Sequence, residues 1–349
     1  MVHRIEADEF LKLTSNNPVI DVRSPGEFRA GHIPSSVNIP LFNNKERKKI
    51  GTLYHHKGRE AAIVCGLDIS LNKLERYQFQ INRKVKGNKV LIYCLRGGMR
   101  SENFAAVLNA SGFDVFVLSG GYKAYRRFIR DELSKPLDVF ILGGLTGSGK
   151  TRILQSLKRK GEQIIDLEKL SKHKGSVFGG LDQKKQQTNE QFENDLFLFW
   201  SKLDPSRRVW IEDESRMIGN ITLPPPVFNH ILNGLLVRIN IPGEVRINHL
   251  VREYAVFTVQ VLSRSIEKIR ERLGGTRTGY AHAALVQGDY AQVARIVLEY
   301  YDKAYLHSAA YRKRIFPAVI GLDGLDPSRN ADEILASLQN SLQKEDDLS

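Results

Sequence analysis

Short apolar runs alternate with amphipathic stretches along the first 130 residues. The runs at 18–22, 88–94 and 114–118 are five to seven residues long and rich in Val, Ile and Leu, which is typical of buried strands. Between the last two, residues 100–111 have helical spacing and are followed by Gly112, a good C-terminal cap. Strands that alternate with helices predict a parallel sheet with helices on both faces.

A second region with the same alternation begins after a predicted linker at residues 131–136. Its predicted strands lie at 137–142, 163–167, 208–212, 237–241 and 319–322, and its predicted helices at 152–160 and 332–342. Residues 244–314 differ in pattern and composition, because they have helical spacing throughout and are rich in Arg and Tyr. We therefore predict an α/β protein with a parallel-sheet domain at 1–130, followed by a second α/β domain at 136–349 in which 244–314 are largely helical.

Composition and charge narrow the class of protein. The 349 residues are 42% hydrophobic and 26% charged, as in ordinary globular proteins, and no run approaches the roughly 20 apolar residues of a membrane helix. Two cysteines are too few for a disulfide framework, which favours a reducing, cytoplasmic location. The net charge of +13 is either a basic soluble surface or the footprint of a polyanionic partner such as a nucleic acid. No membrane or protein partner is indicated.

Cys94 is the first candidate for chemistry. It ends an apolar strand and precedes Arg-Gly-Gly-Met-Arg-Ser, in which the glycines suit a tight loop before a helix. Loop amides, the helix N-terminus and the side chains of Arg96 and Arg100 would favour the thiolate, which is the nucleophilic form of cysteine. Together with Gly97 and Gly98, these arginines would bind an oxyanion beside the sulfur. A lone cysteine on a strand is more often a packing residue, but the residues that follow favour function.

Residues 1–130 resemble the rhodanese family. The likeness rests on three stretches, DVRSPGEF at 21–28, GHIPSSVNIP at 31–40 and GGY at 120–122. The resemblance implies a cysteine that carries a chalcogen atom, and it implies that Asp21, Arg23 and His32 support the fold and take no part in the chemistry.

The cysteine loop departs from the family in its length. Common sulfurtransferases have Cys-x4-Arg, whereas Cys94 and Arg100 are separated by five residues. A longer loop should hold a larger group. The same spacing occurs in cysteine phosphatases, which keeps a phosphatase interpretation open, although Tyr93 stands where those enzymes place His.

Residues 144–151, GLTGSGKT, match the phosphate-loop pattern G-x4-G-K-[ST] in full and lie between an apolar strand and a helix. The loop amides of this motif cradle a diphosphate, a lysine neutralises it and a hydroxyl binds Mg²⁺. We therefore predict a diphosphate site made of Gly144, Gly147, Ser148, Gly149, Lys150 and Thr151.

An acidic run follows the predicted strand at 208–212. We predict that Asp213 is the carboxylate on the metal side of the phosphate loop, with Thr151, and that Glu212 is second to it. A solvated acidic turn is the alternative. The sequence leaves open whether the loop binds ATP.

The fusion of these two domains is similar to the tRNA 2-selenouridine synthase family. The likeness runs from about residue 5 to 340 and rests on 51–62 (GTLYHHKGREAA), 93–101, 175–179 (GSVFG), 210–219 (WIEDESRMIG), and GD at 288–289 leading to YYDKAY at 300–305. The resemblance implies a substrate, tRNA with wobble 2-thiouridine, whose sulfur is replaced by selenium from selenophosphate. It also implies an S-geranyl intermediate made from geranyl diphosphate, which converts the sulfur into a leaving group, so that geranylthiol departs when selenium attacks.

Basic residues spaced along 244–314 are the predicted contacts to tRNA. The predicted set is Arg252, Arg264, Lys268, Arg272 and Arg277, with Arg246, Arg270, Tyr254 and Tyr280 as further candidates. The alternative is a solvated face whose arginine stems cover the core.

Two other functions stay open at this point. One is a sulfurtransferase or cysteine phosphatase fused to a small phosphate-loop kinase. The other is a tRNA-binding module without catalysis, which fits poorly with an intact Cys94, Lys150 and Thr151 in one chain.

Overall fold

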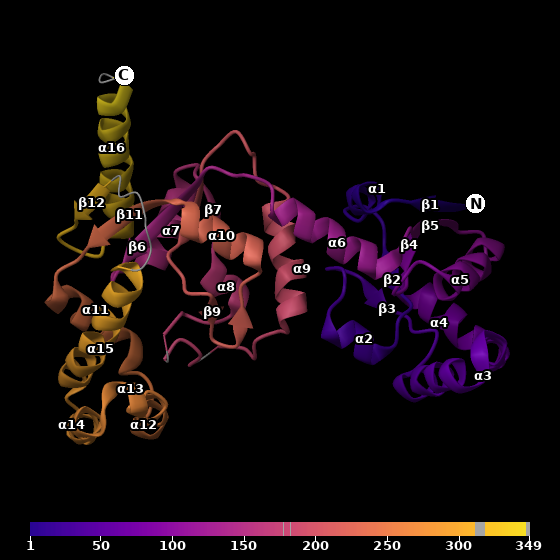
Figure 1. The fold of residues 1–349 in the computed structure, drawn as a ribbon, viewed down its shortest axis with the longest axis horizontal. Helices are drawn as coiled ribbons and strands as arrows, with labels where there is room; N and C mark the ends of the chain where they lie inside the picture. The colour runs from indigo at the N-terminus through magenta and orange to yellow at the C-terminus, as the bar shows by residue number, and fades with distance from the viewer. Residues whose placement is uncertain (177, 182, 311–317, 347–349) are drawn as a thin grey trace. The chain divides into compact units, whose positions relative to one another are not determined.

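The computed structural model describes residues 1–176, 178–181, 183–310 and 318–346, and the chain divides into two compact units (Figure 1). The first contains Met1–Ser134 and Glu190–Leu198, and the second contains Lys135–Asn189 and Phe199–Ser349. The linker expected at 131–136 is helical in its first half, because helix α6 (Gly121–Leu133) extends into it as far as the buried Leu133. Sequence patterns also did not indicate that residues 190–198 return to the first unit.

The first unit is built on a five-stranded parallel sheet, which confirms the predicted parallel architecture. The strand order is β1 (Val2–Ile5), β5 (Asp114–Leu118), β4 (Lys89–Tyr93), β2 (Val19–Asp21) and β3 (Val37–Asn38). The central strand β4 is buried on both faces, since Val90 and Ile92 face one core and Leu91 and Tyr93 the other. A strand buried on both sides explains its continuous apolar sequence.

Helices cover both faces of this sheet. On the Val90 face, α4 (Leu74–Lys84) and α5 (Met99–Ala110) contribute Tyr77 and Phe104 to the core. The opposite core receives Phe10 from α1 (Ala7–Leu13), Tyr125 from α6, and Phe197 from α9 (Asn189–Trp200). Helices α2 (Pro25–Ala30) and α3 (Asn44–Leu71) complete the unit, and α3 is kinked at Gly58, where φ is 83°.

The second unit also contains a five-stranded parallel sheet. Its order is β12 (Ala318–Gly321), β11 (Leu235–Asn240), β6 (Val139–Gly144), β8 (Val209–Glu212) and β7 (Gln163–Ile165). Residues of β6, β8 and β11 pack with α7 (Lys150–Arg159) and α16 (Pro327–Asp346) in one apolar core. The remaining elements outside the helical region are α8 (Leu167–Ser171), α10 (Pro225–Asn233), and an antiparallel pair formed by β9 (Met217–Ile218) and β10 (Ile221–Thr222).

The helical region of the second unit contains five helices between residues 243 and 310. They are α11 (Gly243–Tyr254), α12 (Val259–Glu267), α13 (Arg270–Leu273), α14 (Gly275–Val286) and α15 (Tyr290–Ala310), and Figure 1 shows α12, α13 and α14 gathered beside α15. Residues 311–314 of the predicted helical segment lie outside the described part of the chain. Within the described residues, no helix combines the length and apolarity that crossing a bilayer requires.

Candidate active sites

The first candidate site is the turn that carries Cys94 from β4 into α5. Two backbone bonds hold this turn against the start of α6, from Tyr122 N to Cys94 O at 2.8 Å and from Lys123 N to Leu95 O at 3.1 Å. A Cβ on Gly121 would lie 2.4 Å from Cys94 O, so only glycine fits where the two turns meet. The fixed end of the strand therefore presents the sulfur at one defined place.

Cys94 is only 2% exposed and packs in the same apolar core as Val90 and Ile92. Its hydrogen-bond donor is the buried hydroxyl of Ser101, with Oγ 3.2 Å from Sγ, and the same hydroxyl is 3.0 Å from Gly98 O. Sequence reasoning predicted that loop amides would surround the sulfur and did not name Ser101. The sequence did give one indication of Ser101: it directly follows Arg100, at the start of the helix that follows the cysteine loop.

The two loop arginines differ in their surroundings. Arg96 is exposed, whereas Arg100 is partly buried and its Nη1 lies 3.2 Å from Glu27 Oε2. Burial alone would raise the pKa of Glu27, but Arg100 and the hydrogen bonds from Ser24 lower it below its ordinary value. The exposed side chain of Arg96 can therefore move toward a bound anion, whereas Glu27 holds Arg100 at the rim of the loop.

Asp21, Arg23 and His32 lie in supporting positions. Arg23 is buried, donates to Asp21 Oδ2 and to Gly31 O at 2.6 Å each, and stacks 3.8 Å from the centre of the Tyr122 ring. The His32 ring stacks on Phe28 at 3.8 Å. These contacts fix the segments around the loop and do not point at the sulfur.

The second candidate site is the phosphate loop between β6 and α7. Gly147 and Gly149 have φ of 81° and 75°, values that suit glycine and turn the loop into the first turn of α7. Lys150 Nζ donates to Gly144 O at 2.8 Å and so lies across the loop. Thr151 Oγ1 donates to Glu168 Oε2 at 2.8 Å.

Arg246 supports this loop from α11. It is buried, donates to Thr146 O at 3.1 Å, and forms a bidentate pair with Asp302 at 2.9 and 2.8 Å. The proposal that Arg246 contacts tRNA is therefore wrong, because its guanidinium is used inside the protein. Bidentate pairing fixes the arginine plane, and with it the position of the loop.

Three glutamates gather beside Thr151. Oxygen atoms of Glu168, Glu212 and Glu214 lie within 4.8 Å of one another. Glu212, at the end of β8, is completely buried, and neither of its carboxylate oxygens accepts a hydrogen bond of normal length from a described residue. Burial, followed by the charges of Glu168 and Glu214, raises the pKa of Glu212 well above its ordinary value.

Asp213, predicted to be the carboxylate on the metal side of the loop, lines the cavity beside the phosphate loop and lies outside the cluster of three glutamates. Its Oδ2 accepts a hydrogen bond of 2.9 Å from the Tyr305 hydroxyl, which in turn accepts from Gly144 N at 3.2 Å. Asp213 therefore joins the start of the phosphate loop to α15, while Glu212 faces the other two glutamates. Glu168, which lies on α8, could not be identified from sequence because no motif marks it.

Two cavities adjoin the phosphate loop. A polar cavity of about 640 Å³ is lined by every residue of the loop except Leu145, by Glu168, Asp213 and Glu214, and by Lys174 and Arg272. Beside it, a narrow, almost entirely apolar pocket of about 50 Å³ is lined by side chains that include Leu262, Val293, Val297 and Leu298. The two share five lining residues, which are Thr146, Ser176, Leu250, Tyr254 and Tyr301.

The predicted tRNA contacts are spread over the helical region. Arg252, Arg264, Lys268 and Arg272 are exposed, and Arg277 pairs with Glu299 at 3.0 Å. Tyr254, expected on the surface, lines both cavities and contacts Phe178, and burial raises its pKa. Tyr280 is exposed, as stacking would require.

Comparisons with known proteins match both units. A family model described as "tRNA 2-selenouridine synthase AAA domain" matches residues 137–319, and one described as "Rhodanese-like domain" matches residues 6–128. A tRNA 2-selenouridine synthase of Nitrosomonas eutropha is 31% identical over 91% of this chain and 95% of its own length. Another, of Hydrogenovibrio crunogenus, is 35% identical over 78% of this chain and 80% of its own length.

Among solved structures, a rhodanese-related protein of Thermoplasma volcanium is 20% identical, with a TM-score of 0.23, over 36% of this chain and 92% of that one.

Proposed function

The chain belongs to the tRNA 2-selenouridine synthase family and is a transferase that forms selenouridine in tRNA, and from this premise we propose that its two units perform two successive steps. In the first step, the phosphate-loop unit attaches a geranyl group to the sulfur of wobble 2-thiouridine. In the second, the Cys94 unit replaces the geranylated sulfur with selenium from selenophosphate. The tRNA substrate supports a cytoplasmic location.

The observation that carries the first step is that the two cavities of the second unit lie side by side and share five lining residues. A phosphate loop that opens onto an apolar pocket suits a diphosphate with a hydrocarbon tail, whereas a nucleotide would present a polar sugar there. We propose that Lys150 and the loop amides bind the diphosphate of geranyl diphosphate and that the tail passes between Tyr254 and Tyr301. The five shared residues would lie around the junction of head and tail.

The pocket must widen to accept the whole tail. Its volume of about 50 Å³ is well below the roughly 150 Å³ of an engineered apolar cavity that accepts benzene in another protein. We therefore propose that α12 and α15 separate slightly as the tail enters. Loss of this adjustment in a rigid variant would weaken binding of the tail and leave binding of the diphosphate unchanged.

The glutamates beside Thr151 fit a divalent cation. Glu212 is a buried carboxylate whose oxygens lack donors among the described residues, and carboxylate oxygens are the ligands that Mg²⁺ prefers. We propose that Glu168, Glu212 and Glu214, with Thr151 alongside, hold Mg²⁺. Bound there, the cation would neutralise charge on the departing diphosphate.

Geranylation then forms one bond and breaks one. The thiouridine sulfur attacks C1 of the geranyl group, the C–O bond breaks, diphosphate leaves with the electron pair, and the base loses a proton from nitrogen to solvent water. With the diphosphate bound in the loop, Lys150, which lies across the loop, and the loop amides would stabilise the negative charge of the leaving group.

For the second step we propose that Cys94 attacks phosphorus. Selenium in selenophosphate is fully reduced, so its transfer onto the thiolate would need an oxidant, whereas attack on phosphorus needs none. The S–P bond forms, the P–Se bond breaks, and the released selenide attacks C2 of the base and expels geranylthiolate. Water then removes the phosphoryl group from Cys94.

The length of the loop supports this assignment. Five residues separate Cys94 from Arg100, as in loops that hold a phosphoryl group, and the Ser101 hydroxyl can stabilise the sulfur when it leaves phosphorus. Acid quenching followed by ³¹P NMR should detect a phosphocysteine. A cysteine adduct with the isotope pattern of selenium and no phosphorus would contradict attack on phosphorus.

A substitution in the phosphate loop tests the division of labour. Lys150→Ala should abolish geranylation of a 2-thiouridine anticodon stem-loop, measured by mass spectrometry of its nucleosides. The same variant should convert pre-geranylated RNA to selenouridine at the wild-type rate. Normal geranylation by Lys150→Ala would remove the phosphate loop from the first step.

A further inference from the structure

The first half of α3 carries the most concentrated unpaired positive charge of the first unit. Lys45, Lys48 and Lys49 are exposed and lie at helical spacing on one face, and His55 and His56 continue that face for a total of about 16 Å. Every residue from 54 to 60 is exposed, including Tyr54, whose side chain is 56% accessible. The opposite face contributes Ile50 to the core, so the helix has a fixed orientation.

The charge on this helix is not compensated locally. Residues 44–71, which form α3, contain six lysines and arginines and three acidic residues. In the described part of the chain, no acidic residue forms an ion pair with five of the cations of α3, which are Lys45, Lys48, Lys49, Lys57 and Arg59. Exposed lysines held on one face without counter-charges attract polyanions.

The helical region of the second unit has a different charge balance. Residues 243–310 contain nine lysines and arginines and seven acidic residues. Several of the cations there are paired, as in Arg246–Asp302, Arg270–Glu267, Arg277–Glu299, Arg295–Glu244 and Lys303–Glu299. The region expected to bind tRNA therefore carries less free charge than α3.

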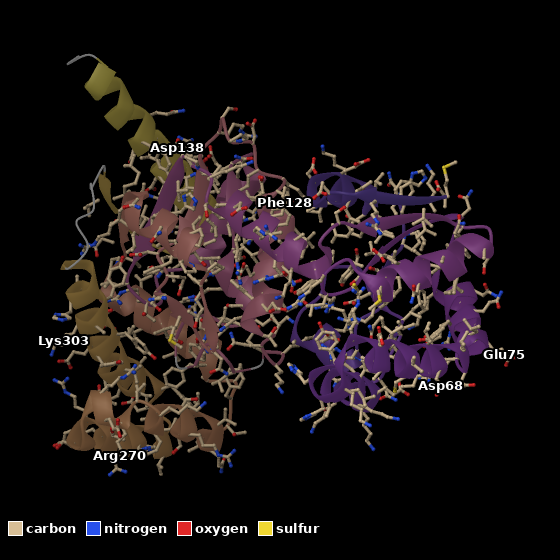
Figure 2. All side chains as sticks on the ribbon, turned by 45° about the vertical axis from the view of Figure 1, so that its right-hand side comes forward. Asp68, Glu75, Phe128, Asp138, Arg270 and Lys303 are labelled. Carbon is tan, nitrogen blue, oxygen red and sulfur yellow. The ribbon has the colours of Figure 1, made fainter. Side chains whose placement is uncertain are left out.

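The start of α3 lies beside the Cys94 loop. Asn44 Oδ1 accepts from Gly26 N at 2.7 Å, and Arg47 Nε lies 3.9 Å from Glu27 Oε2. Glu27 in turn pairs with Arg100 of the loop. A strand of RNA lying on α3 would thus run past the rim of the cysteine loop. Figure 2 labels Asp68 near the end of this helix, and side chains extend outward along its length.

From these observations we propose that α3 is an RNA-binding surface, on which the backbone next to the modified base is held while the base enters the Cys94 loop. Lys45, Lys48 and Lys49 contact phosphates, and Tyr54 stacks on an unpaired base. The anticodon loop is single-stranded, and its bases are available for such stacking. The inference rests on the proposed role of the Cys94 loop in the second step.

The test compares two charge-matched double variants of the full-length protein. Lys48→Ala with Lys49→Ala alters the α3 surface. Lys86→Ala with Lys89→Ala removes the same charge at the start of β4, about 16 Å along the strand from Cys94. Binding of a fluorescein-labelled anticodon stem-loop is followed by fluorescence anisotropy at several salt concentrations, without either co-substrate.

The α3 variant should bind about tenfold more weakly at low salt, and the slope of log K against log salt should fall by roughly 1.4, or about 0.7 for each lost phosphate contact. The β4 variant should retain wild-type affinity and slope. Unchanged binding by the α3 variant, or equal loss in both variants, would overturn the proposal. Because no chemistry is involved, a wrong assignment of either catalytic step would leave this result intact.

Discussion

Glu212 offers the most quantitative test of the second unit. Its side chain is fully buried, and neither carboxylate oxygen has a donor among the described residues. A buried polar group left without a partner costs about 1–3 kcal/mol, and more when it is charged. Glu212→Gln keeps the shape of the side chain and removes the charge, so it should stabilise the metal-free protein at neutral pH.

The pH dependence follows from the direction of the pKa shift. Because the pKa of Glu212 in the folded protein is raised, its stabilising contribution is complete below the ordinary pKa of glutamate and is lost as the pH rises through the folded value. Metal-free wild type should therefore weaken as the pH rises above the ordinary pKa of glutamate. Glu212→Gln should show a flatter profile and be about 1–3 kcal/mol more stable at pH 8, or roughly 2–4 °C in Tm for each kcal/mol.

Mg²⁺ should reverse the order of the two proteins. At 100 times its Kd, a bound cation stabilises the folded state by about 2.7 kcal/mol, which is roughly 5–10 °C for a unit of this size. Differential scanning fluorimetry of the second unit's transition in the full-length protein measures this shift. Wild type should gain it at pH 8 and lose it at pH 5, whereas Glu212→Gln should gain little at either pH.

Asp213→Asn is the matched control. Asp213 neighbours Glu212 in sequence, carries the same charge and was the residue that sequence reasoning favoured, yet its carboxylate bonds to Tyr305. The structure predicts that Asp213→Asn keeps the Mg²⁺ shift. If Asp213→Asn abolishes the shift and Glu212→Gln does not, the assignment of the cation to the three glutamates is refuted.

Three further substitutions test the Cys94 loop, the apolar pocket and the support of the phosphate loop. Ser101→Ala removes the hydroxyl that is hydrogen-bonded to Sγ and should slow alkylation of Cys94 by iodoacetamide at pH 7 about tenfold, as expected for one hydrogen bond to a charged group. Ser101→Thr should restore the rate of alkylation. An unchanged rate in Ser101→Ala would exclude a role for this hydrogen bond. Val297→Phe fills the apolar pocket and should raise the KM for geranyl diphosphate without changing inhibition by inorganic diphosphate. If the KM and the inhibition constant change equally, the geranyl tail binds outside this pocket. Arg246→Ala leaves Asp302 unpaired beside the phosphate loop and should destabilise the second unit by about 3–5 kcal/mol, measured by urea unfolding. A loss of stability under about 1 kcal/mol would mean that the Arg246–Asp302 pair does not support the loop.

Local sequence patterns predicted the strands that carry both loops. β4 and β6 are continuous apolar runs followed by glycine-rich turns, so a short window contains the whole signal. The same is true of residues 94–100 and 144–151, each of which is one segment of chain. The expected linker at 131–136 failed in part because burial of Ile129 and Leu133 extends α6 through polar residues.

Features assembled from distant segments were not predictable in this way. The glutamate cluster joins α8 to the end of β8, and the apolar pocket joins α11, α12 and α15, so neither has a fixed spacing. Tertiary packing decides where two adjacent carboxylates lie: Glu212 is buried in the glutamate cluster, and Asp213 lines the polar cavity. The same packing buries Arg246, which the Arg-rich composition of residues 244–314 suggested would lie on the surface.

Cys94→Ser gives the most direct test of two steps at two sites. A 2-thiouridine anticodon stem-loop is incubated with geranyl diphosphate, selenophosphate, Mg²⁺ and the variant in stoichiometric amounts, and its nucleosides are followed by mass spectrometry over time. We predict that S-geranyl-2-thiouridine accumulates at the wild-type rate and that no selenouridine forms. Selenouridine formation by this variant, or failure to form the geranylated nucleoside, would contradict this prediction.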